Sequence, residues 1–303
     1  MLRNYQLEFL FAVLVGVSVF VTRVPDRTSF VFSEKTVRRE TARVFLQPLQ
    51  TDSLESFPVK DQFSASLYDS LPAEVQAFSL LVADLDSGAI LSGKNTDKRW
   101  LPASLTKLMT ALVAAEDMGL NKRVRVSEEA AATEGVAGEL AVGEVYSVSD
   151  LVKIMLLTSS NDAAEALADF YGRKEFIDKM NVKALELGMK DTEFFDPSGL
   201  SDLNQSTAFD IKKLAVYLIE RYWNIFSVTV RPRLAVGGKS LQNINQFSGK
   251  EGFLGGKTGY LETAKRNLVS LFRINGKRIL FIVLGSPDHY ADTEILTKWL
   301  SSK

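Results

Sequence analysis

Residues 101–113 of the chain read LPASLTKLMTALV, with apolar residues at helical spacing after Ser104. On a helix, residues three positions apart lie on one face, so Ser104 and Lys107 can meet without help from the rest of the fold. A lysine that burial keeps neutral can take the proton of a serine hydroxyl and make it a nucleophile. Ser104 is the only serine with a lysine three residues later, which favours this interpretation over a helix cap followed by a surface lysine.

Composition limits the kinds of protein that the chain can be. Its 303 residues are 46% hydrophobic and 24% charged, which is typical of one or two globular domains. The net charge of −1 provides no basic field for nucleic acid. There is no cysteine, which excludes disulfides, thiolate zinc sites and a cysteine nucleophile. The single histidine, His289, excludes a multi-histidine metal site, and its turn-like surroundings predict an ordinary surface residue. We expect no metal or cofactor.

The N-terminus carries a targeting signal. Residues 9–21 form an uncharged apolar run of 13 residues, and Arg3 precedes it. The length fits a signal-peptide core better than a comfortable membrane span, but tilting or bilayer thinning would let it cross. No small-x-small cleavage site follows the run, so we favour an uncleaved membrane anchor over a removed signal peptide for residues 1–22. Both interpretations place the rest of the chain outside the cytoplasm.

A change in amino-acid composition near residue 72 divides the remaining chain into a predicted stalk and a predicted domain. Residues 23–72 contain four prolines and are rich in Ser, Thr, Asp and Glu. This composition predicts a stalk or linker. Residues 73–303 predict one catalytic domain. Its predicted strands are 77–83, 89–91, 255–260, 267–273 and 278–285, and its predicted helices are 100–117, 149–157, 161–171, 174–187, 207–222 and 291–300. Strands at both ends and a helical block between them predict an α+β fold.

Two finer signals locate elements within this domain. Ser149 is a plausible cap for the helix that begins there. The pair Asn275-Gly276 is a strong hairpin signal between the last two predicted strands.

Two further motifs carry chemical groups. Residues 158–163 read TSSNDA, so that Ser159 and Asn161 can present a hydroxyl and an amide to one cleft. Residues 255–260 read GGKTGY, which invites comparison with a phosphate-binding loop. Such a loop needs glycine where Glu251 stands and a helix after it, whereas a strand is predicted here. We therefore interpret Lys257, Thr258 and the following glycine as a strand edge that offers a cation and a hydroxyl to a substrate.

The motifs S-x-x-K, S-x-N and K-T-G, in this order, resemble those of the serine penicillin-binding protein and β-lactamase superfamily. The chain is most similar to the low-molecular-mass D-alanyl-D-alanine carboxypeptidases over about residues 77–300. The similarity includes residues 102–112 (PASLTKLMTAL), 159–168 (SSNDAAEALA) and 197–200 (PSGL). It implies a DD-peptidase-like domain, with an antiparallel sheet flanked by helices and an inserted helical subdomain. Relatives often carry a C-terminal β-domain and tail anchor that are not found before Lys303, so we expect the N-terminal segment to provide any anchoring.

The resemblance assigns catalytic roles to four residues. Ser104 attacks the carbonyl between the two terminal D-alanines of a peptidoglycan stem peptide. Lys107 is the acylation base, held nearly neutral by burial and by Lys257. Ser159 relays the proton to the leaving amine, and Asn161 positions the substrate backbone and Lys107. β-Lactams are expected to acylate the same serine and to leave slowly.

The resemblance assigns substrate binding to the third motif. Lys257 and Thr258 face the terminal carboxylate, and Gly259 allows the substrate to approach the strand. The backbone N–H groups of Ser104 and Tyr260 form the oxyanion hole. The expected partners are thus peptidoglycan stem peptides, β-lactams as covalent inhibitors and, through the N-terminal segment, the bacterial cell membrane.

Three alternatives remain open. An endopeptidase that cuts D-alanyl cross-links would use the same residues. A class A β-lactamase also needs a glutamate in an E-x-x-L-N context, and no such segment lies between the second and third motifs. A non-catalytic β-lactam sensor or scaffold is the alternative from another class; a sensor should carry a cytoplasmic partner domain, but only about eight residues precede the apolar run.

One departure from the family pattern concerns the terminal carboxylate. Relatives commonly have Ala-Gly and an aromatic residue after K-T-G, where this chain has Ala264, Lys265 and Arg266. Many relatives also carry an arginine shortly after the final strand, where this chain has Asp288 and His289. We hypothesise that Lys265 or Arg266 binds the carboxylate instead. At most one of the two faces the cleft, because side chains alternate along a strand.

Overall fold

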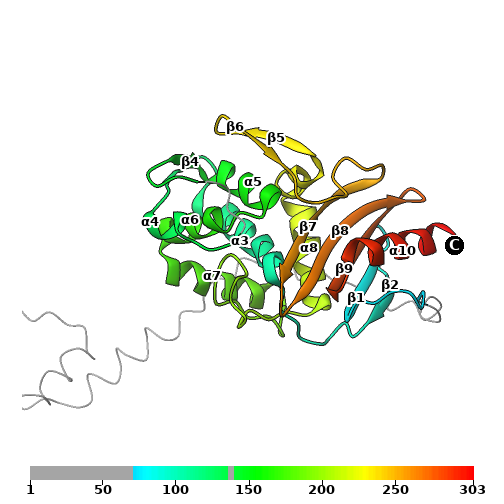
Figure 1. Cartoon of the computed structure of the whole chain (residues 1–303). Coiled ribbons are helices and arrows are strands. Elements are labelled where there is room, and N and C mark those ends of the chain that lie inside the picture. Colours follow the sequence, from blue (N-terminus) through cyan, green and yellow to red (C-terminus); the bar gives the residue numbers. More distant parts are fainter. Residues whose placement is uncertain (1–70, 136–139) are drawn as a thin grey trace, which may run out of the picture. The chain divides into compact units, whose positions relative to one another are not determined.

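The computed structural model describes residues 71–135 and 140–303, and its centre is a five-stranded antiparallel sheet with the order β2-β1-β9-β8-β7 (Figure 1). The strands are β1 (Ser79–Asp84), β2 (Ile90–Lys94), β7 (Phe253–Leu261), β8 (Lys265–Ile274) and β9 (Lys277–Ser286). The first hairpin lies beside the last strand, since β1 pairs with β9. Strands from both ends of the chain thus build one sheet, as the sequence predicts. The Asn275-Gly276 turn joins β8 to β9, also as predicted.

The central strand β9 is buried on both faces, which explains its continuous apolar sequence. Leu280, Ile282 and Leu284 belong to the large core cluster that the helical region shares. Phe281 and Val283 belong to a second cluster, which packs against the closing helix. Successive side chains of a strand point to opposite faces, so one strand supplies both layers.

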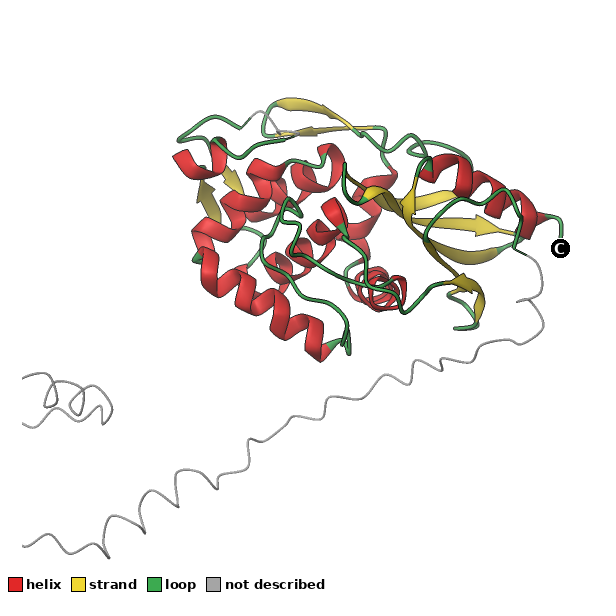
Figure 2. Ribbon diagram, turned by 60° about the horizontal axis from the view of Figure 1, so that its bottom comes forward, coloured by secondary structure: helices red, strands yellow, loops and turns green. Residues whose placement is uncertain are grey.

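One helix covers a face of the sheet, and most of the others gather to one side of it. Figure 1 shows α10 (red) across one face and helices α4 to α7 (green) gathered beyond the β7 edge, and Figure 2 shows the same division. The α-helices are α3 (Lys107–Val113), α4 (Glu128–Ala131), α5 (Val148–Thr158), α6 (Asn161–Tyr171), α7 (Arg173–Glu186), α8 (Ala208–Arg221), α9 (Trp223–Phe226) and α10 (His289–Ser301). Two small antiparallel pairs lie outside the main sheet: β3 (Arg123–Arg125) with β4 (Val145–Ser147), and β5 (Arg233–Val236) with β6 (Lys239–Gln242).

The helix predicted over residues 100–117 is instead three consecutive helical pieces. A 3₁₀ turn, η1 (Ala103–Thr106), leads into α3, and a π-helical turn, η2 (Ala114–Met118), follows it. Trp100 lies outside the helix and forms an isolated bridge with Ser206. The 3₁₀ turn matters for the site, because residues three positions apart nearly eclipse one another in it.

The cap predicted for the helix at 149–157 is wrong by two residues. α5 begins at Val148, and its cap is Ser147, whose hydroxyl accepts a hydrogen bond from the backbone N–H of Asp150. The backbone N–H of Ser149 instead donates to the carbonyl of Leu120. Ser147 has the extended backbone that a capping residue needs, whereas Ser149 is already inside the helix.

The prediction of a surface position for His289 is also wrong. α10 begins at His289 rather than at Ala291, so the histidine belongs to the first turn of a helix packed on the sheet. Its side chain is buried and lies in a tilted contact with the ring of Tyr290, and neither ring nitrogen has a hydrogen-bond partner within the part of the chain that the structure describes. Burial, followed by the positive charge of Arg266, lowers the pKa of His289 to about 4. The ring is therefore neutral at pH 7.

The predicted membrane segment (residues 1–22) and nearly all of the predicted stalk lie outside the described residues. The domain boundaries at 22 and 72 stay predictions. Among residues 71–135 and 140–303, no helix combines the length and the apolar character that crossing a membrane requires.

Candidate active site

Ser104 and Lys107 lie together at the start of the first long buried helix. The Nζ of Lys107 donates a hydrogen bond of 2.9 Å to the Oγ of Ser104, as their spacing predicts. Ala103 holds a left-handed backbone, with φ of +49°, immediately before the serine. A Cβ on Gly199 would lie 2.0 Å from the carbonyl oxygen of Ala103, so only glycine fits there. The backbone that presents Ser104 is thus fixed by a close contact with a distant loop.

Lys107 is fully buried and has three oxygen partners. Besides Ser104, its Nζ donates to the Oδ1 of Asn161 at 2.7 Å and to the carbonyl of Ser198 at 2.5 Å. Burial lowers the pKa of Lys107 to about 7, although the negative charges of Asp196, Glu165 and Asp162 oppose the shift. A lysine with this pKa is substantially neutral near pH 7, so it can act as a general base.

The second motif lies where α5 ends and α6 begins. Ser159 terminates α5 in a left-handed conformation, with φ of +61°, and Ser160 caps α6. Asn161 is the first residue of α6 and donates through its Nδ2 to the carbonyl of Glu134 at 2.7 Å. A left-handed conformation is rare outside glycine and costs free energy, and such strain is concentrated at functional sites. Here it turns the Ser159 hydroxyl toward the third motif.

The third motif lies on the edge strand β7. The Nζ of Lys257 donates to the Oγ of Ser159 at 2.8 Å and to the carbonyl of Thr258 at 2.7 Å. Burial, followed by the charge of Lys107, lowers the pKa of Lys257 well below its usual value. For Lys107, burial is the only cause that lowers the pKa, and the charge of Lys257, which was expected to contribute, is not among the causes.

Glycine on β7 permits close contact with the nucleophile segment. A Cβ on Gly259 would lie 2.9 Å from the carbonyl oxygen of Pro102 and 3.2 Å from the backbone nitrogen of Ser104. The strand therefore runs against the start of η1, with Tyr260 as the next residue. Tyr260 is largely exposed.

Sequence reasoning gave no role to Asp196, which organises the loop beside Lys107. Its carboxylate accepts backbone N–H bonds from Ser198, Gly199, Leu200 and Ser201, at distances from 2.5 to 3.3 Å. This arrangement directs the Ser198 carbonyl at Lys107. The turn-forming sequence DPSGL was a signal for the loop, but not for the partner of its carbonyl.

The four predicted catalytic residues and Lys257 form two hydrogen-bonded groups: Lys107 with Ser104 and Asn161, and Lys257 with Ser159. Thr258, Gly259 and Tyr260 continue along the same strand edge. Within residues 71–135 and 140–303, no group of three or more acidic or histidine side chains is arranged to hold a metal ion.

Comparisons with known proteins agree with this geometry. The family described as D-alanyl-D-alanine carboxypeptidase (peptidase S11) matches residues 66–288. The chain belongs to this family. The D-alanyl-D-alanine carboxypeptidase DacF of Bacillus subtilis is 34% identical over 242 residues, which are 74% of this chain and 61% of DacF. The D-alanyl-D-alanine endopeptidase of Pseudomonas aeruginosa is 33% identical over 248 residues, 77% of this chain and 79% of that protein.

Solved structures extend the family assignment to the fold. The D-alanyl-D-alanine carboxypeptidase of Mycobacterium tuberculosis has a TM-score of 0.73 and 28% identity, over 80% of this chain and 97% of that one. Penicillin-binding protein D2 of Listeria monocytogenes, solved with ampicillin bound, has a TM-score of 0.69 and 29% identity, over 75% of this chain and 98% of that one. The predicted family and the predicted DD-peptidase-like α+β fold are confirmed.

Proposed function

We propose that the chain is a serine-type D-Ala-D-Ala carboxypeptidase that removes the terminal D-alanine of peptidoglycan stem peptides through an acyl-enzyme at Ser104. The observation that carries the proposal is the 2.9 Å hydrogen bond between Lys107 and Ser104, at a buried lysine whose pKa is lowered to about 7. A neutral lysine in this position can accept the serine proton as the oxygen attacks. The family membership of the chain and the carboxypeptidases among its relatives support the same reaction.

Acylation would begin when Lys107 takes the proton of Ser104 and the serine oxygen attacks the carbonyl between the two D-alanines. The backbone N–H groups of Ser104 and Tyr260 would stabilise the oxyanion, where one such donor is typically worth about 10²–10³ in rate. Ser159, which is hydrogen-bonded to Lys257, would relay to the leaving amine the proton that Lys107 took from Ser104, so that Lys107 is neutral again once the peptide bond has broken. D-alanine departs, and the acyl group remains as an ester on Ser104.

Deacylation would repeat these steps with water as the nucleophile. Water loses a proton to the base and attacks the ester, and the serine oxygen regains a proton as the shortened peptide leaves. A β-lactam would acylate Ser104 through opening of its ring amide. The relative from Listeria that is solved in ampicillin-bound and cefotaxime-bound forms supports covalent inhibition of this kind.

Endopeptidase action on D-alanyl cross-links is the second candidate function. Relatives from Pseudomonas aeruginosa, Escherichia coli and Haemophilus influenzae are named D-alanyl-D-alanine endopeptidases and are 30% to 35% identical to this chain. The chemistry is unchanged, since the leaving amine then belongs to a second stem peptide instead of free D-alanine.

The terminal carboxylate of the substrate would bind beside Lys257 and Thr258, and Arg266 would supply a second positive charge. Arg266 pairs with Tyr260 across the β7–β8 ladder, and its guanidinium lies 5.2 Å from the centre of the Tyr260 ring. Lys265 lies opposite Leu261, one residue further from the third motif, and both side chains are exposed. This geometry favours Arg266 over Lys265, because Tyr260 itself is assigned to the site.

The proposed location is outside the cytoplasm, with residues 1–22 as an uncleaved anchor in the bacterial cell membrane. The support is the apolar run at 9–21 together with a substrate class that belongs to the cell wall. The full chain should sediment with membranes. Mass spectrometry that finds a mature N-terminus beyond residue 21 would refute the anchor.

Release of D-alanine from a pentapeptide tests the proposed reaction. The full chain should release D-alanine, and Ser104→Ala should abolish the release. Ser301→Ala is the matched control, since Ser301 is exposed at the end of α10 and should be dispensable. Release that persists in Ser104→Ala would reject Ser104 as the nucleophile.

A further inference from the structure

Asn267 is a fully buried polar residue near the start of β8, in a strand whose next residues are mostly apolar. A buried amide costs free energy unless its polar atoms are hydrogen-bonded. Its Nδ2 donates to the carbonyl of Leu101 at 2.8 Å and to the carbonyl of Pro102 at 3.2 Å. Its Oδ1 accepts the backbone N–H of Gly285 at 2.9 Å. The side chain therefore connects the sheet to the segment that immediately precedes Ser104.

The bond to Pro102 lies at the base of the turn that presents the nucleophile. The Pro102 carbonyl also accepts the backbone N–H of Leu105 at 3.1 Å, which closes a turn with Ser104 inside it. Ala103 holds its left-handed backbone in the same turn. Strain of this kind persists only where the surrounding structure imposes it. The Asn267 amide is one of the groups that impose it, because it fixes the carbonyl at the base of the turn.

The backbone of Asn267 lies beside the other half of the site. Asn267 pairs with Gly259 across the β7–β8 ladder, and paired residues project from the same face of a sheet. A Cβ on Gly259 would lie 2.9 Å from the carbonyl oxygen of Pro102, so a side chain there would crowd the nucleophile segment. The asparagine can therefore reach this carbonyl from the neighbouring strand, and Tyr260 follows directly after Gly259.

A β-bulge fixes the orientation of the amide. The β8–β9 ladder shifts register between Arg266 and Leu268, so that Leu284 and Gly285 both lie opposite Asn267. A bulge leaves a residue of the longer strand without its ordinary ladder pairing. The Oδ1 of Asn267 accepts the N–H of Gly285 at this point, and its Nδ2 is thereby directed at the carbonyls before the nucleophile.

We propose that Asn267 is a positioning residue of the active site, which sets the distance between the two donors of the oxyanion hole. The inference rests on the proposed function, because it takes the backbone N–H groups of Ser104 and Tyr260 as these donors. The side chain of Asn267 holds the turn that carries Ser104, and its backbone pairs with the residue before Tyr260. The oxyanion forms only in the transition state, so loss of this bridge should lower kcat and leave KM nearly unchanged.

Asn267→Ala tests this role through the rate of acylation. The full chain and the variant are reacted with labelled penicillin and assayed on a pentapeptide, and both rates are expressed per labelled site, so that misfolded chains do not contribute. The acylation rate constant and kcat should each fall by at least about tenfold, since a small misplacement of reacting groups can cost up to about 10²-fold. KM should stay within about twofold.

Asn267→Asp separates the donor from the acceptor of the amide. An ionised carboxylate keeps an oxygen for the N–H of Gly285 but has no hydrogen to donate to the carbonyls of Leu101 and Pro102. This variant should therefore be slowed by at least about tenfold as well, although the bulge keeps its hydrogen bond.

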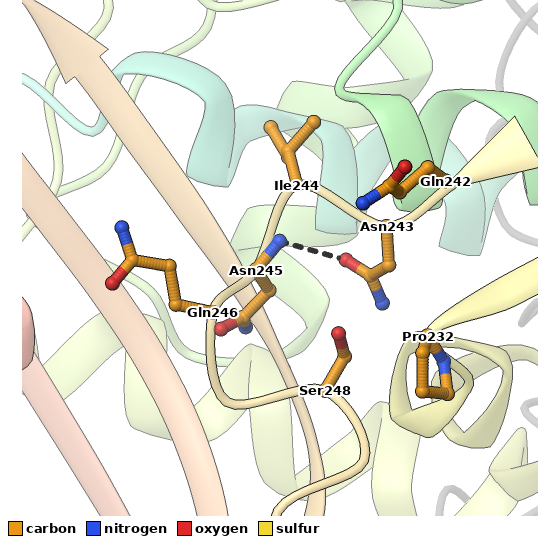
Figure 3. Close-up of a pocket in the computed structure, with 7 residues that line it drawn as sticks. All are labelled: Pro232, Gln242, Asn243, Ile244, Asn245, Gln246 and Ser248. Atoms are coloured by element: carbon orange, nitrogen blue, oxygen red, sulfur yellow. Dashed lines mark hydrogen bonds between the residues drawn. The ribbon is translucent and has the colours of Figure 1, made fainter.

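Asn243 offers a matched control, because its amide makes the same set of bonds in the loop of residues 242–248. Its Nδ2 donates to the carbonyls of Thr229 and Arg231, and its Oδ1 accepts the backbone N–H of Asn245, the bond drawn in Figure 3. Asn243→Ala should lower the temperature of unfolding about as much as Asn267→Ala does. Its acylation rate per labelled site should stay within about twofold of the wild-type rate.

The outcomes separate the positioning role from the reaction. An acylation rate per labelled site near that of the wild type in either Asn267 variant, an equal loss in Asn243→Ala, or a loss that appears in KM instead of kcat would overturn the role and leave the carboxypeptidase assignment standing. If Asn267→Ala does not fold, Asn267→Asp decides in the same way. A wild-type chain that neither binds penicillin covalently nor cleaves the pentapeptide would overturn the proposed function, and the positioning role with it.

Discussion

The rate of acylation should depend on pH through Lys107. Its neutral form is the base, and burial lowers its pKa to about 7, so the base is present above that pH and is lost as the pH falls. For one group of pKa about 7, the second-order rate constant should fall to about a tenth of its plateau at pH 6 and about a hundredth at pH 5. The assay is labelling of the full chain with fluorescent penicillin between pH 5 and pH 9.

A substitution near Lys107 tests the direction in which its pKa should shift. The negative charge of Glu165 raises the pKa of Lys107, so Glu165→Gln should lower it and move the acidic limb of the profile to lower pH. The variant should therefore be faster than the wild type at pH 6 and equal to it at pH 9. Glu175→Gln, at an exposed residue in the first turn of α7, should leave the profile unchanged.

Two results would refute the reasoning about Lys107. A limb near pH 10, where an ordinary lysine titrates, would mean that burial does not lower the pKa. A limb that moves to higher pH in Glu165→Gln would mean that Lys107 is not the titrating base, because removal of a negative charge cannot favour the protonated ammonium.

Three further substitutions have defined outcomes. Gly199→Ala should reduce the free energy of unfolding in urea by more than about 2 kcal/mol, because its Cβ would overlap a backbone carbonyl, whereas Gly88→Ala, with a similar positive φ but open space, should cost about 1 kcal/mol. Lys107→Ala should slow acylation by at least about 10²-fold while the fold persists by circular dichroism; a near-normal rate would exclude it as the base. Arg266→Ala should reduce the preference for a peptide acid over its C-terminal amide, and Lys265→Ala should not; if neither does, Arg266 has no part in binding the carboxylate.

Local patterns of the sequence were sufficient for much of the fold. The helix predicted at 161–171 forms as α6 with the same bounds, since its cap, apolar face and terminating glycine are all local signals. The contact between Ser104 and Lys107 also follows from spacing alone. The first and last residues of β7, β8 and β9 differ from the predicted bounds by only a few positions, because apolar runs bounded by turns are strong strand signals.

Tertiary contacts decided what the sequence patterns could not. The bond between Lys257 and Ser159 joins residues 98 positions apart, and no spacing rule predicts it; the resemblance to a family assigned both residues to the site but not their contact. The burial of His289 depends on where α10 packs. The role of Asp196 depends on the hydrogen bond between the Ser198 carbonyl and the Nζ of Lys107. Neither is encoded in a window of neighbouring residues.

Mapping the site of penicillin attachment tests the central claim most directly. After reaction of the full chain with penicillin, intact mass spectrometry should show one adduct, and peptide mapping should place it on Ser104. Ser104→Ala should acquire no adduct, although its thermal unfolding is unchanged. An adduct on any other residue, or labelling that survives in Ser104→Ala, would contradict the assignment of Ser104 and Lys107 as nucleophile and base.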